Sequence, residues 1–167
     1  EGLCDLDWVK HWTNGPVLVH EDLRPVTENE VVEGGSARRF AVVDEATGTL
    51  MWQGPKLNEK GAIVGFDHDP LQPLLLSHTT DVTFLNGKVE RVSTAFDAFR
   101  KVNDRYTPEE TSKITGIPVD TIVETARDFF KLKGVCDDGW YSSRNANDVE
   151  AFGMMNVINL FTGRFDR

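Results

Sequence analysis

The sequence has few cysteines, a deficit of basic residues and no long apolar run, and each shortage excludes a class of protein. Its two cysteines, Cys4 and Cys136, lie far apart and form neither a disulfide framework nor a paired-cysteine metal motif. Lys and Arg number 18 against 27 Asp and Glu, so the net charge of −9 argues against a nucleic-acid-binding surface. No apolar run approaches the ~20 residues of a membrane span, so we expect no membrane insertion by this segment.

Recognisable catalytic and metal-binding motifs are also missing. The sequence contains no glycine-rich phosphate loop and no pair of histidines at helical spacing. The one histidine with acidic neighbours, His68 between Asp67 and Asp69, precedes Pro70 and is more typical of a polar turn than of a metal site. We therefore predict neither catalytic residues nor metal ligands in this chain.

The composition is that of an ordinary folded domain. Of the 167 residues, 40% are hydrophobic, 10% aromatic and 27% charged, which is enough for one domain with a sizeable core. The chain opens on Glu1 rather than on Met and shows no secretory signal. We therefore expect residues 1–167 to be a single internal domain or fragment of a longer protein.

Two helices joined by a tight turn form the clearest feature. Thr107 and Pro108 are typical of a helix start, and Glu110 can reach back to the cap. Gly116 ends this helix, and Pro118 opens a second one that runs to about Lys131. The second helix carries a single apolar stripe: Val119, Ile122, Val123, Ala126 and Phe130.

The middle of the chain, residues 37–93, predicts a β-rich insert. One hairpin pairs residues 39–44 with 49–52 around a turn that ends at Gly48. Another pairs 81–85 with 88–92 around Asn-Gly, which is the strongest short-range signal of a hairpin. Residues 53–78 are interrupted by proline and glycine and predict irregular structure, and the acidic residues 21–37 predict an exposed loop.

Further helices are predicted near both ends of the chain. They cover residues 5–12, 95–106 and about 147–162, and the last is apolar on nearly every side, which is typical of a buried helix. Short strands are expected at 17–19 and 135–136. The predicted fold class is therefore α+β, or irregular α/β, with two β-hairpins, about five helices and a helical segment over 95–167.

The helix pair also has the outline of a helix-turn-helix DNA-binding motif. However, the second helix begins with Asp120 and Glu124 and offers no arginine to bases before Arg127. Packing of two amphipathic helices in a core explains the same pattern better. We therefore expect no nucleic acid among the partners.

Several short segments point to a known family. They are Tyr106-Thr107-Pro108-Glu109, Thr115-Gly116-Ile117-Pro118 with Ile122, Ala126-Arg127, and Asp138 to Ser143. In this order they resemble the molybdopterin oxidoreductases of the dimethyl sulfoxide reductase family.

The two ends of the chain carry the same resemblance. Asn159 to Arg167 is similar to the family's Asn-Leu-Leu-Thr-Gly-Asn-Ile-Asp-Arg, although Arg164 replaces the commoner asparagine. Asp5 to Val9 with Thr13 to Pro16 resembles another family stretch, with Cys4 in place of its tyrosine. The β-rich insert looks like that of the polysulfide and thiosulfate reductase branch.

The resemblance implies an internal fragment of a larger catalytic subunit. The parent would hold molybdopterin guanine dinucleotide with molybdenum or tungsten and an iron–sulfur cluster, and would catalyse two-electron or oxygen-atom transfer. The fragment itself is expected to hold no cofactor and to be inactive alone. Its partners would be the remainder of the parent catalytic subunit and an iron–sulfur electron-transfer subunit, in the periplasm or cytoplasm of a prokaryote.

One loop is the best candidate for a cofactor contact. It lies between a predicted strand end and a helix start, where α/β folds gather ligand contacts. The side chains suited to stacking on or hydrogen-bonding a pterin, or to lining the substrate funnel, are Trp140, Tyr141, Ser142, Ser143 and Asn145. The alternative for this loop is a plain surface loop. The alternative for the whole chain is a stand-alone protein-binding or scaffold domain whose exposed apolar surface serves a partner.

Overall fold

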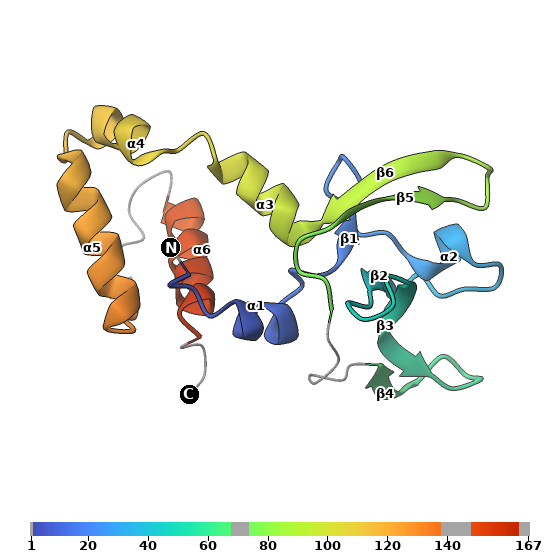
Figure 1. Ribbon diagram of the computed structural model, residues 1–167. Helices are drawn as coiled ribbons and strands as arrows, with labels where there is room; N and C mark the ends of the chain where they lie inside the picture. Colours follow the sequence, from blue (N-terminus) through green and yellow to red (C-terminus); the bar gives the residue numbers. More distant parts are fainter. Residues whose placement is uncertain (1, 68–73, 138–147, 164–167) are drawn as a thin grey trace. The chain divides into compact units, whose positions relative to one another are not determined.

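A computed structural model describes residues 2–67, 74–137 and 148–163 of the chain (Figure 1). It divides into two compact units, one formed by residues 10–103 and the other by residues 1–9 together with 104–167. The described residues form six helices and two antiparallel three-stranded sheets, which confirms the predicted α+β class.

The first sheet of unit 10–103 has the order β1–β6–β5. Strand β1 (Leu18–Val19) pairs with β6 (Val89–Thr94), and β6 pairs with β5 (Thr79–Thr83), both antiparallel. Asn86 and Gly87 form the predicted turn, and the φ of 81° at Gly87 is the left-handed backbone that this turn requires. The second predicted hairpin is confirmed.

The second sheet has the order β2–β3–β4, as Figure 1 shows. Strand β2 (Phe40–Val43) pairs with the first half of β3 (Leu50–Leu57), and Val43 lies opposite Leu50 as the turn ending at Gly48 predicts. The second half of β3 pairs with β4 (Ile63–Asp67).

The prediction of irregular structure throughout residues 53–78 is wrong, because β3 continues to Leu57 and β4 follows it. The misleading signal was Pro55, which cannot donate to a strand ladder. Pro55 lies opposite Phe66 of β4, whereas the β2 pairing of β3 ends at Gln53. Proline is tolerated here since β4 is the one strand of the described residues that pairs with β3 at this point.

The prediction of an exposed loop over residues 21–37 is also partly wrong. Val26 is completely buried, and it is followed by the short helix α2 (Glu28–Val31). Thr27 and Glu30 form a reciprocal capping box at its start, with the Thr27 backbone N–H donating to Glu30 Oε2 at 2.8 Å. The acidic composition of this stretch had suggested an exposed loop, although it contains the core residue Val26 and the helix cap Thr27.

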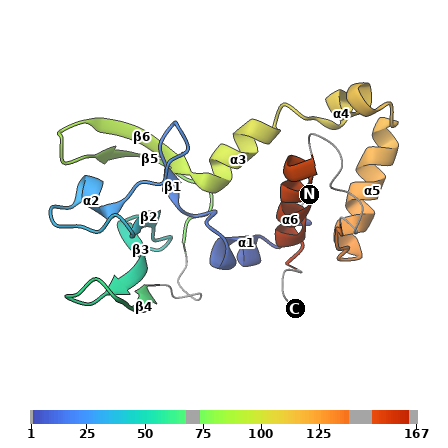
Figure 2. The same cartoon turned by 180° about the vertical axis from the view of Figure 1, so that it is seen from behind.

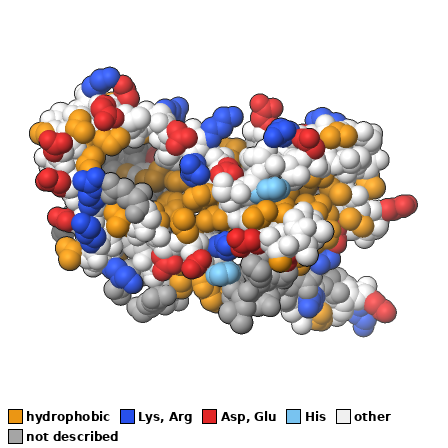
Figure 3. All heavy atoms as spheres, viewed as in Figure 1, with side chains coloured by type: hydrophobic (Ala, Val, Ile, Leu, Met, Phe, Trp, Pro, Cys, Tyr) orange, Lys and Arg blue, Asp and Glu red, His pale blue; other side chains and the backbone are white. Residues whose placement is uncertain are grey.

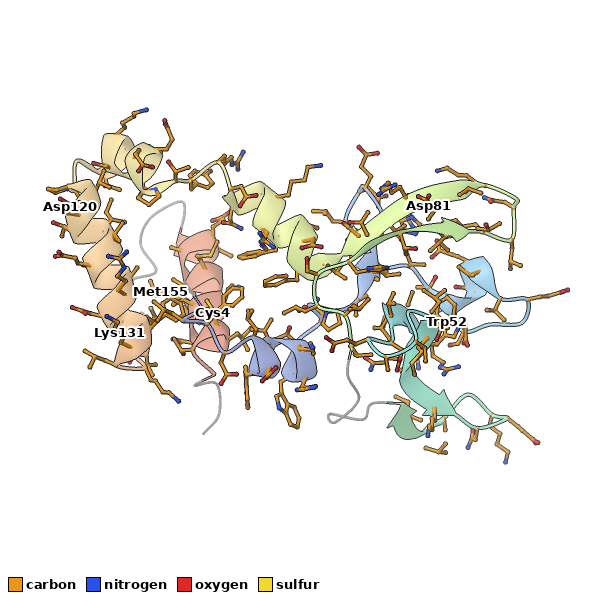
Figure 4. The ribbon with its side chains drawn as sticks, viewed as in Figure 1. Cys4, Trp52, Asp81, Asp120, Lys131 and Met155 are labelled. Carbon is orange, nitrogen blue, oxygen red and sulfur yellow. The ribbon has the colours of Figure 1, made fainter. Side chains whose placement is uncertain are left out.

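One apolar core joins the two sheets of this unit, and its members come from both sheets and from the segment between β1 and β2. The buried members are Leu18, Val26, Ala41, Val43, Val82, Phe84 and Val92, with Val31, Leu50, Trp52 and Leu75 packed against them. Figure 4 labels Trp52 among the side chains of the second sheet. Helix α3 (Ala95–Asn103) follows β6 directly, and the fully buried Thr94 accepts a hydrogen bond from the Asp97 N–H at its start.

The other unit contains the predicted helix pair, which is confirmed. Helix α4 (Pro108–Thr115) begins with Thr107 Oγ1 accepting from the Glu110 N–H at 3.2 Å. Gly116 ends it with a left-handed φ of 74°. The Glu110 carboxylate is paired with Lys113 rather than reaching back to the cap.

Helix α5 (Val119–Lys131) follows, and both ribbon views show the chain turning sharply between α4 and α5 (Figures 1 and 2). Figure 4 shows Asp120 near its first turn and Lys131 near its last, charges that stabilise the two poles of the helix dipole. The predicted stripe is half-buried at Ile122 and Phe130, while Ala126 is exposed.

Helices α1 and α6 are formed by residues near the two ends of the chain. Helix α1 (Leu6–Trp12) confirms the predicted helix, with Asp5 Oδ1 accepting from the Trp8 N–H at 2.9 Å. Helix α6 (Asp148–Phe161) confirms the apolar helix near the end of the chain. The strand predicted at residues 135–136 is wrong, since neither residue lies in a strand and Val135 is 62% exposed.

The core and its surface can be compared on a single strand. Val92 of β6 is 1% exposed and Val89 of the same strand is 60% exposed. We predict that Val92→Ala lowers the free energy of unfolding by about 2 kcal/mol, because it removes two buried methyl groups and leaves a cavity. Urea unfolding measures this loss.

The matched control is Val89→Ala, for which we expect a change of less than about 0.5 kcal/mol. Equal losses in the two variants would contradict the described core.

Candidate functional site

The five residues predicted to contact a cofactor lie outside the described residues. They are Trp140, Tyr141, Ser142, Ser143 and Asn145. The structure does describe the segment that leads into them, which ends at Asp137, and helix α6, which follows them.

The approach to this loop is fixed by one side chain of α6. The Asn159 Oδ1 accepts a hydrogen bond from the Cys136 N–H at 2.8 Å, and the Asn159 Nδ2 donates to the Cys136 carbonyl at 2.9 Å. Asn159 is 8% exposed, so both hydrogen bonds are shielded from water. Asn159 is therefore a hydrogen-bonded core amide, and its partner is the backbone just before the candidate loop.

The end of α6 also binds the beginning of the chain. The Phe161 carbonyl accepts from the Asp5 N–H at 2.8 Å, which satisfies one of the last carbonyls of the helix. Gly163 follows with a φ of 65°, and a Cβ at this position would lie 2.6 Å from Asp5 Oδ2. Glycine is therefore required twice here, for the backbone conformation and for the close approach of Asp5.

Three parts of the chain that are distant in sequence thus meet at the C-terminal end of α6: Asp5, Cys136 and residues 159–163. Two of them, Asp5 and residues 159–163, belong to segments that resemble the oxidoreductase family. Their contacts are backbone and amide hydrogen bonds, which position a segment but transfer no proton or electron. Cys4 and Cys136 are both free thiols.

A second candidate lies in unit 10–103, where a pocket of about 530 Å³ opens beside His20. The His20 side chain is 7% exposed, and its ring stacks on Phe84 with 5.2 Å between the ring centroids. The His20 Nδ1 lies 3.0 Å from Glu90 Oε1 of β6, and the Nε2 lies 3.5 Å from Glu30 Oε1 of α2. The ring is therefore held between two carboxylates from different elements.

Basic side chains flank both carboxylates. Lys88 Nζ lies 2.8 Å from Glu90 Oε2, and Arg24 Nη1 lies 3.8 Å from Glu30 Oε1. Hydrogen bonding to Lys88, and then to His20, lowers the pKa of the Glu90 carboxyl. Burial opposes ionisation of Glu30, but hydrogen bonds from the Thr27 side chain and backbone outweigh it and lower the pKa of Glu30.

Sequence reasoning missed this pocket entirely. His20, Glu30 and Glu90 share no motif spacing, and they lie together only because the fold places α2 and β6 beside His20. The buried run Leu18–Val19 directly before His20 was the one available signal. Within the described residues, no group of three or more His, Cys, Asp or Glu side chains is placed to hold a metal ion.

Comparison with known proteins identifies relatives along almost the whole chain. Perchlorate reductase subunit alpha of Dechloromonas aromatica is 29% identical over 191 residues, which cover 98% of this chain and 20% of that protein. Dimethylsulfide dehydrogenase subunit alpha of Rhodovulum sulfidophilum is 28% identical over 163 residues, covering 96% of this chain and 17% of that protein.

A third relative is the dopamine dehydroxylase of Eggerthella lenta, 23% identical over 192 residues and 74% of this chain. The chain spans about a fifth of the length of these curated relatives. No protein-family model matches it. None of the helices in the described ranges has the length and apolar character needed to cross a membrane.

The contact between Asn159 and Cys136 can be tested directly. We predict that Asn159→Ala lowers the free energy of unfolding by about 1–3 kcal/mol, since it leaves a backbone N–H and a carbonyl without their partner. The same variant should accelerate hydrogen exchange at the Cys136 amide, as measured by NMR.

Asn156→Ala is the matched control on the same helix, because Asn156 donates only to the Phe152 carbonyl of its own helix among the bonds described. We expect a smaller loss there and no change at Cys136. Unchanged exchange at Cys136 in Asn159→Ala would contradict the described anchor.

Proposed function

Since the chain belongs to the dimethyl sulfoxide reductase family of molybdopterin oxidoreductases, we propose that it is an internal segment of such a catalytic subunit, where it supports the pterin cofactor and the substrate funnel. The observation that carries this proposal is similarity over nearly all of the chain to alpha subunits about five to six times as long. The β-rich residues 37–93 would be an insert of that subunit, and the polysulfide and thiosulfate reductase branch stays a prediction.

The position of the candidate loop supports this role. Asn159 fixes the backbone at Cys136, two residues before the loop, and α6 begins directly after it. The described residues on the two sides of 138–147 are thus hydrogen-bonded to α6 or part of it. A loop attached in this way can hold Trp140 and Tyr141 for stacking on a flat ring system, with Ser142, Ser143 and Asn145 as hydrogen-bonding groups.

Exposed apolar surface on α6 supports burial within a larger subunit. Val149, Phe152 and Met154 are 81%, 49% and 40% exposed, and Glu150 is the one charged side chain among residues 149–154. In Figure 3 hydrophobic side chains are also visible among the charged ones over α4 and α5, where Ile114 is 71% exposed. The remainder of the parent subunit would cover such surface, whereas a stand-alone scaffold domain would offer it to a separate partner.

The side chains proposed for the cofactor contact are aromatic rings, hydroxyls and an amide, which can stack on or hydrogen-bond a pterin. When bound in the parent, the molybdenum or tungsten bis-pterin group would supply two-electron or oxygen-atom transfer, with electrons passing through iron–sulfur clusters. This chain would bind and orient the pterin, and an iron–sulfur subunit would be a partner of the whole enzyme.

The test is a substitution in the full-length subunit that contains this segment. We predict that Trp140→Ala lowers the bound pterin or the kcat/KM of the purified enzyme by about tenfold or more, because it removes a stacking surface. Cofactor content is measured by release of the oxidised pterin fluorophore, and activity with an artificial electron donor.

Trp12→Ala, at a tryptophan of α1 that is 57% exposed, is the control and should leave both quantities within about twofold. Full pterin content and full activity in Trp140→Ala would contradict the proposed role of the loop.

For the 167-residue chain alone, we predict no stoichiometric molybdenum or iron in elemental analysis. One atom of either per chain would overturn the assignment of the ligands to other parts of the parent.

A further inference from the structure

The pocket beside His20 is lined by loop 20–25, by helix α2 and by the β5–β6 hairpin. Its volume of about 530 Å³ lies within the range of about 300–1,000 Å³ that is typical of sites for small organic ligands. Both ribbon views show α2 beside this hairpin, and the Leu85 N–H joins the two by donating to the Glu30 carbonyl at 2.9 Å (Figures 1 and 2). The wall of the pocket is therefore held by backbone as well as by side chains.

Acidic side chains outnumber basic ones along this wall. Its charged residues are four acids and two bases: Glu21, Asp22, Glu30, Glu90, Arg24 and Lys88. The Arg24 guanidinium is already paired with Asp22 at 2.7 Å. The Lys88 ammonium is already paired with Glu90 at 2.8 Å. Glu21 makes no ion pair with any residue that the structure describes, so the wall keeps negative charge that its own cations do not neutralise.

The Glu30 carboxylate is closely hydrogen-bonded through one of its two oxygens. Its Oε2 accepts from the Thr27 N–H at 2.8 Å and from the Thr27 hydroxyl at 2.7 Å. Burial opposes ionisation, but these hydrogen bonds lower the pKa of Glu30, so the side chain is a carboxylate at neutral pH.

The other oxygen of Glu30 has longer contacts. Among the described residues, Oε1 lies 3.5 Å from His20 Nε2 and 3.8 Å from Arg24 Nη1. Charge-assisted N–H···O bonds have lengths of about 2.7–2.9 Å, so an added donor can approach Oε1 more closely than either neighbour does. The Glu30 side chain is 29% exposed, which leaves it accessible to such a donor.

His20 also lines the pocket and has a nitrogen without a partner. The His20 side chain is 7% exposed, and its Nδ1 is hydrogen-bonded to Glu90 Oε1 at 3.0 Å. Its Nε2, which is directed toward Glu30 Oε1, has no hydrogen-bond partner among the described residues. Buried polar atoms of this kind are uncommon, and one at the wall of a pocket indicates a site that binds a further polar group.

Apolar side chains complete the wall. Phe84 and Leu85 line the pocket beside the charged residues, and Leu85 is 55% exposed. Such surface packs well against methylene groups, which form the stems of arginine and lysine side chains below their charged heads. The pocket thus combines unneutralised acids with an apolar surface.

We propose that this pocket binds an organic cation with a guanidinium or ammonium head and an aliphatic stem. The head pairs with Glu30 Oε1 beside His20, and the stem lies against Leu85. A guanidinium suits the site best, because its five N–H donors can bind Glu30 and a neighbouring acceptor such as Glu21 together. This inference rests on the residues of unit 10–103 and does not depend on the proposed role of the chain in a larger enzyme.

The first experiment follows the ¹H–¹⁵N spectrum of the 167-residue chain at neutral pH during addition of two guanidinium compounds. Agmatine represents a free amine, and N-acetyl-arginine methylamide represents an arginine side chain of a protein. We expect saturable shifts at the Glu30, Leu85 and Asn86 amides, with a Kd on the order of 1 mM for the better ligand. The tighter of the two identifies the source of the cation. Absence of saturable shifts with both compounds at about tenfold that concentration would overturn the proposal.

Two further compounds test whether the charge is recognised. N-acetyl-citrulline methylamide has a head of the same shape without the charge, and we expect no binding. N-acetyl-glutamate methylamide carries the opposite charge, and we expect no binding either. Equal binding of the citrulline and arginine compounds would contradict a cation site, and preferential binding of the glutamate compound would show that Arg24 and Lys88 dominate instead.

The second experiment repeats the titration with Glu30→Gln. Glutamine also serves at the third position of a capping box, so this variant removes the charge and keeps the cap of α2. We expect the Kd to rise about tenfold or more, because a charge-assisted partner is lost. Glu90→Gln, which leaves the cap untouched, is a second variant in which we also expect weaker binding.

Glu33→Gln is the matched control. It removes the same charge from an exposed residue that follows α2 and does not line the pocket. Its Kd should stay within about twofold of the wild-type value, because exposed charges outside the site are screened. An unchanged Kd in Glu30→Gln, or equal weakening in Glu33→Gln, would contradict the assignment of the head to Glu30.

Discussion

The structure of unit 10–103 depends on the backbone of Val26. Its N–H donates to the Leu18 carbonyl of β1, and its carbonyl accepts from the Ala41 N–H of β2, both at 2.9 Å. Each sheet has only three short strands and would be marginal alone, but Val26 joins them around one core. Loop 20–25 connects β1 to Val26, so the two hydrogen bonds of the Val26 backbone also hold His20 and Arg24 beside the pocket.

Local chemistry made much of the fold predictable. The Asn86-Gly87 turn, the Thr107 cap and the left-handed Gly116 each act within a few residues, and the structure contains all three. What could not be predicted depended on neighbours distant in sequence. Val26 lies in an acidic stretch and is buried only because two strands flank it, while Pro55 lies in a strand that has one neighbour at that point.

The candidate sites divide in the same way. The candidate loop with Trp140 and Tyr141 was proposed from its resemblance to a family and from its predicted place between a strand and a helix, and neither argument needs knowledge of contacts. Asn159 could be identified as a buried amide from its place on an apolar helix, but its partner Cys136 could not. The pocket could not be predicted from the sequence, because His20 interacts with Glu30 and Glu90 only where the fold places α2 and β6 beside His20.

The change of partner along β3 has a consequence for the behaviour of the chain in solution. Beyond Gln53, no strand of the described residues pairs with β3 on the side that faced β2, and unpaired strand edges recruit strands of other molecules into aggregates. Pro55 lies on this edge and supplies no N–H to an incoming strand, while Gly54 lies so close to Arg38 that a Cβ would meet its carbonyl oxygen at 2.3 Å. Pro55, which made the strand hard to predict from the sequence, is therefore also a residue that limits intermolecular pairing at this edge.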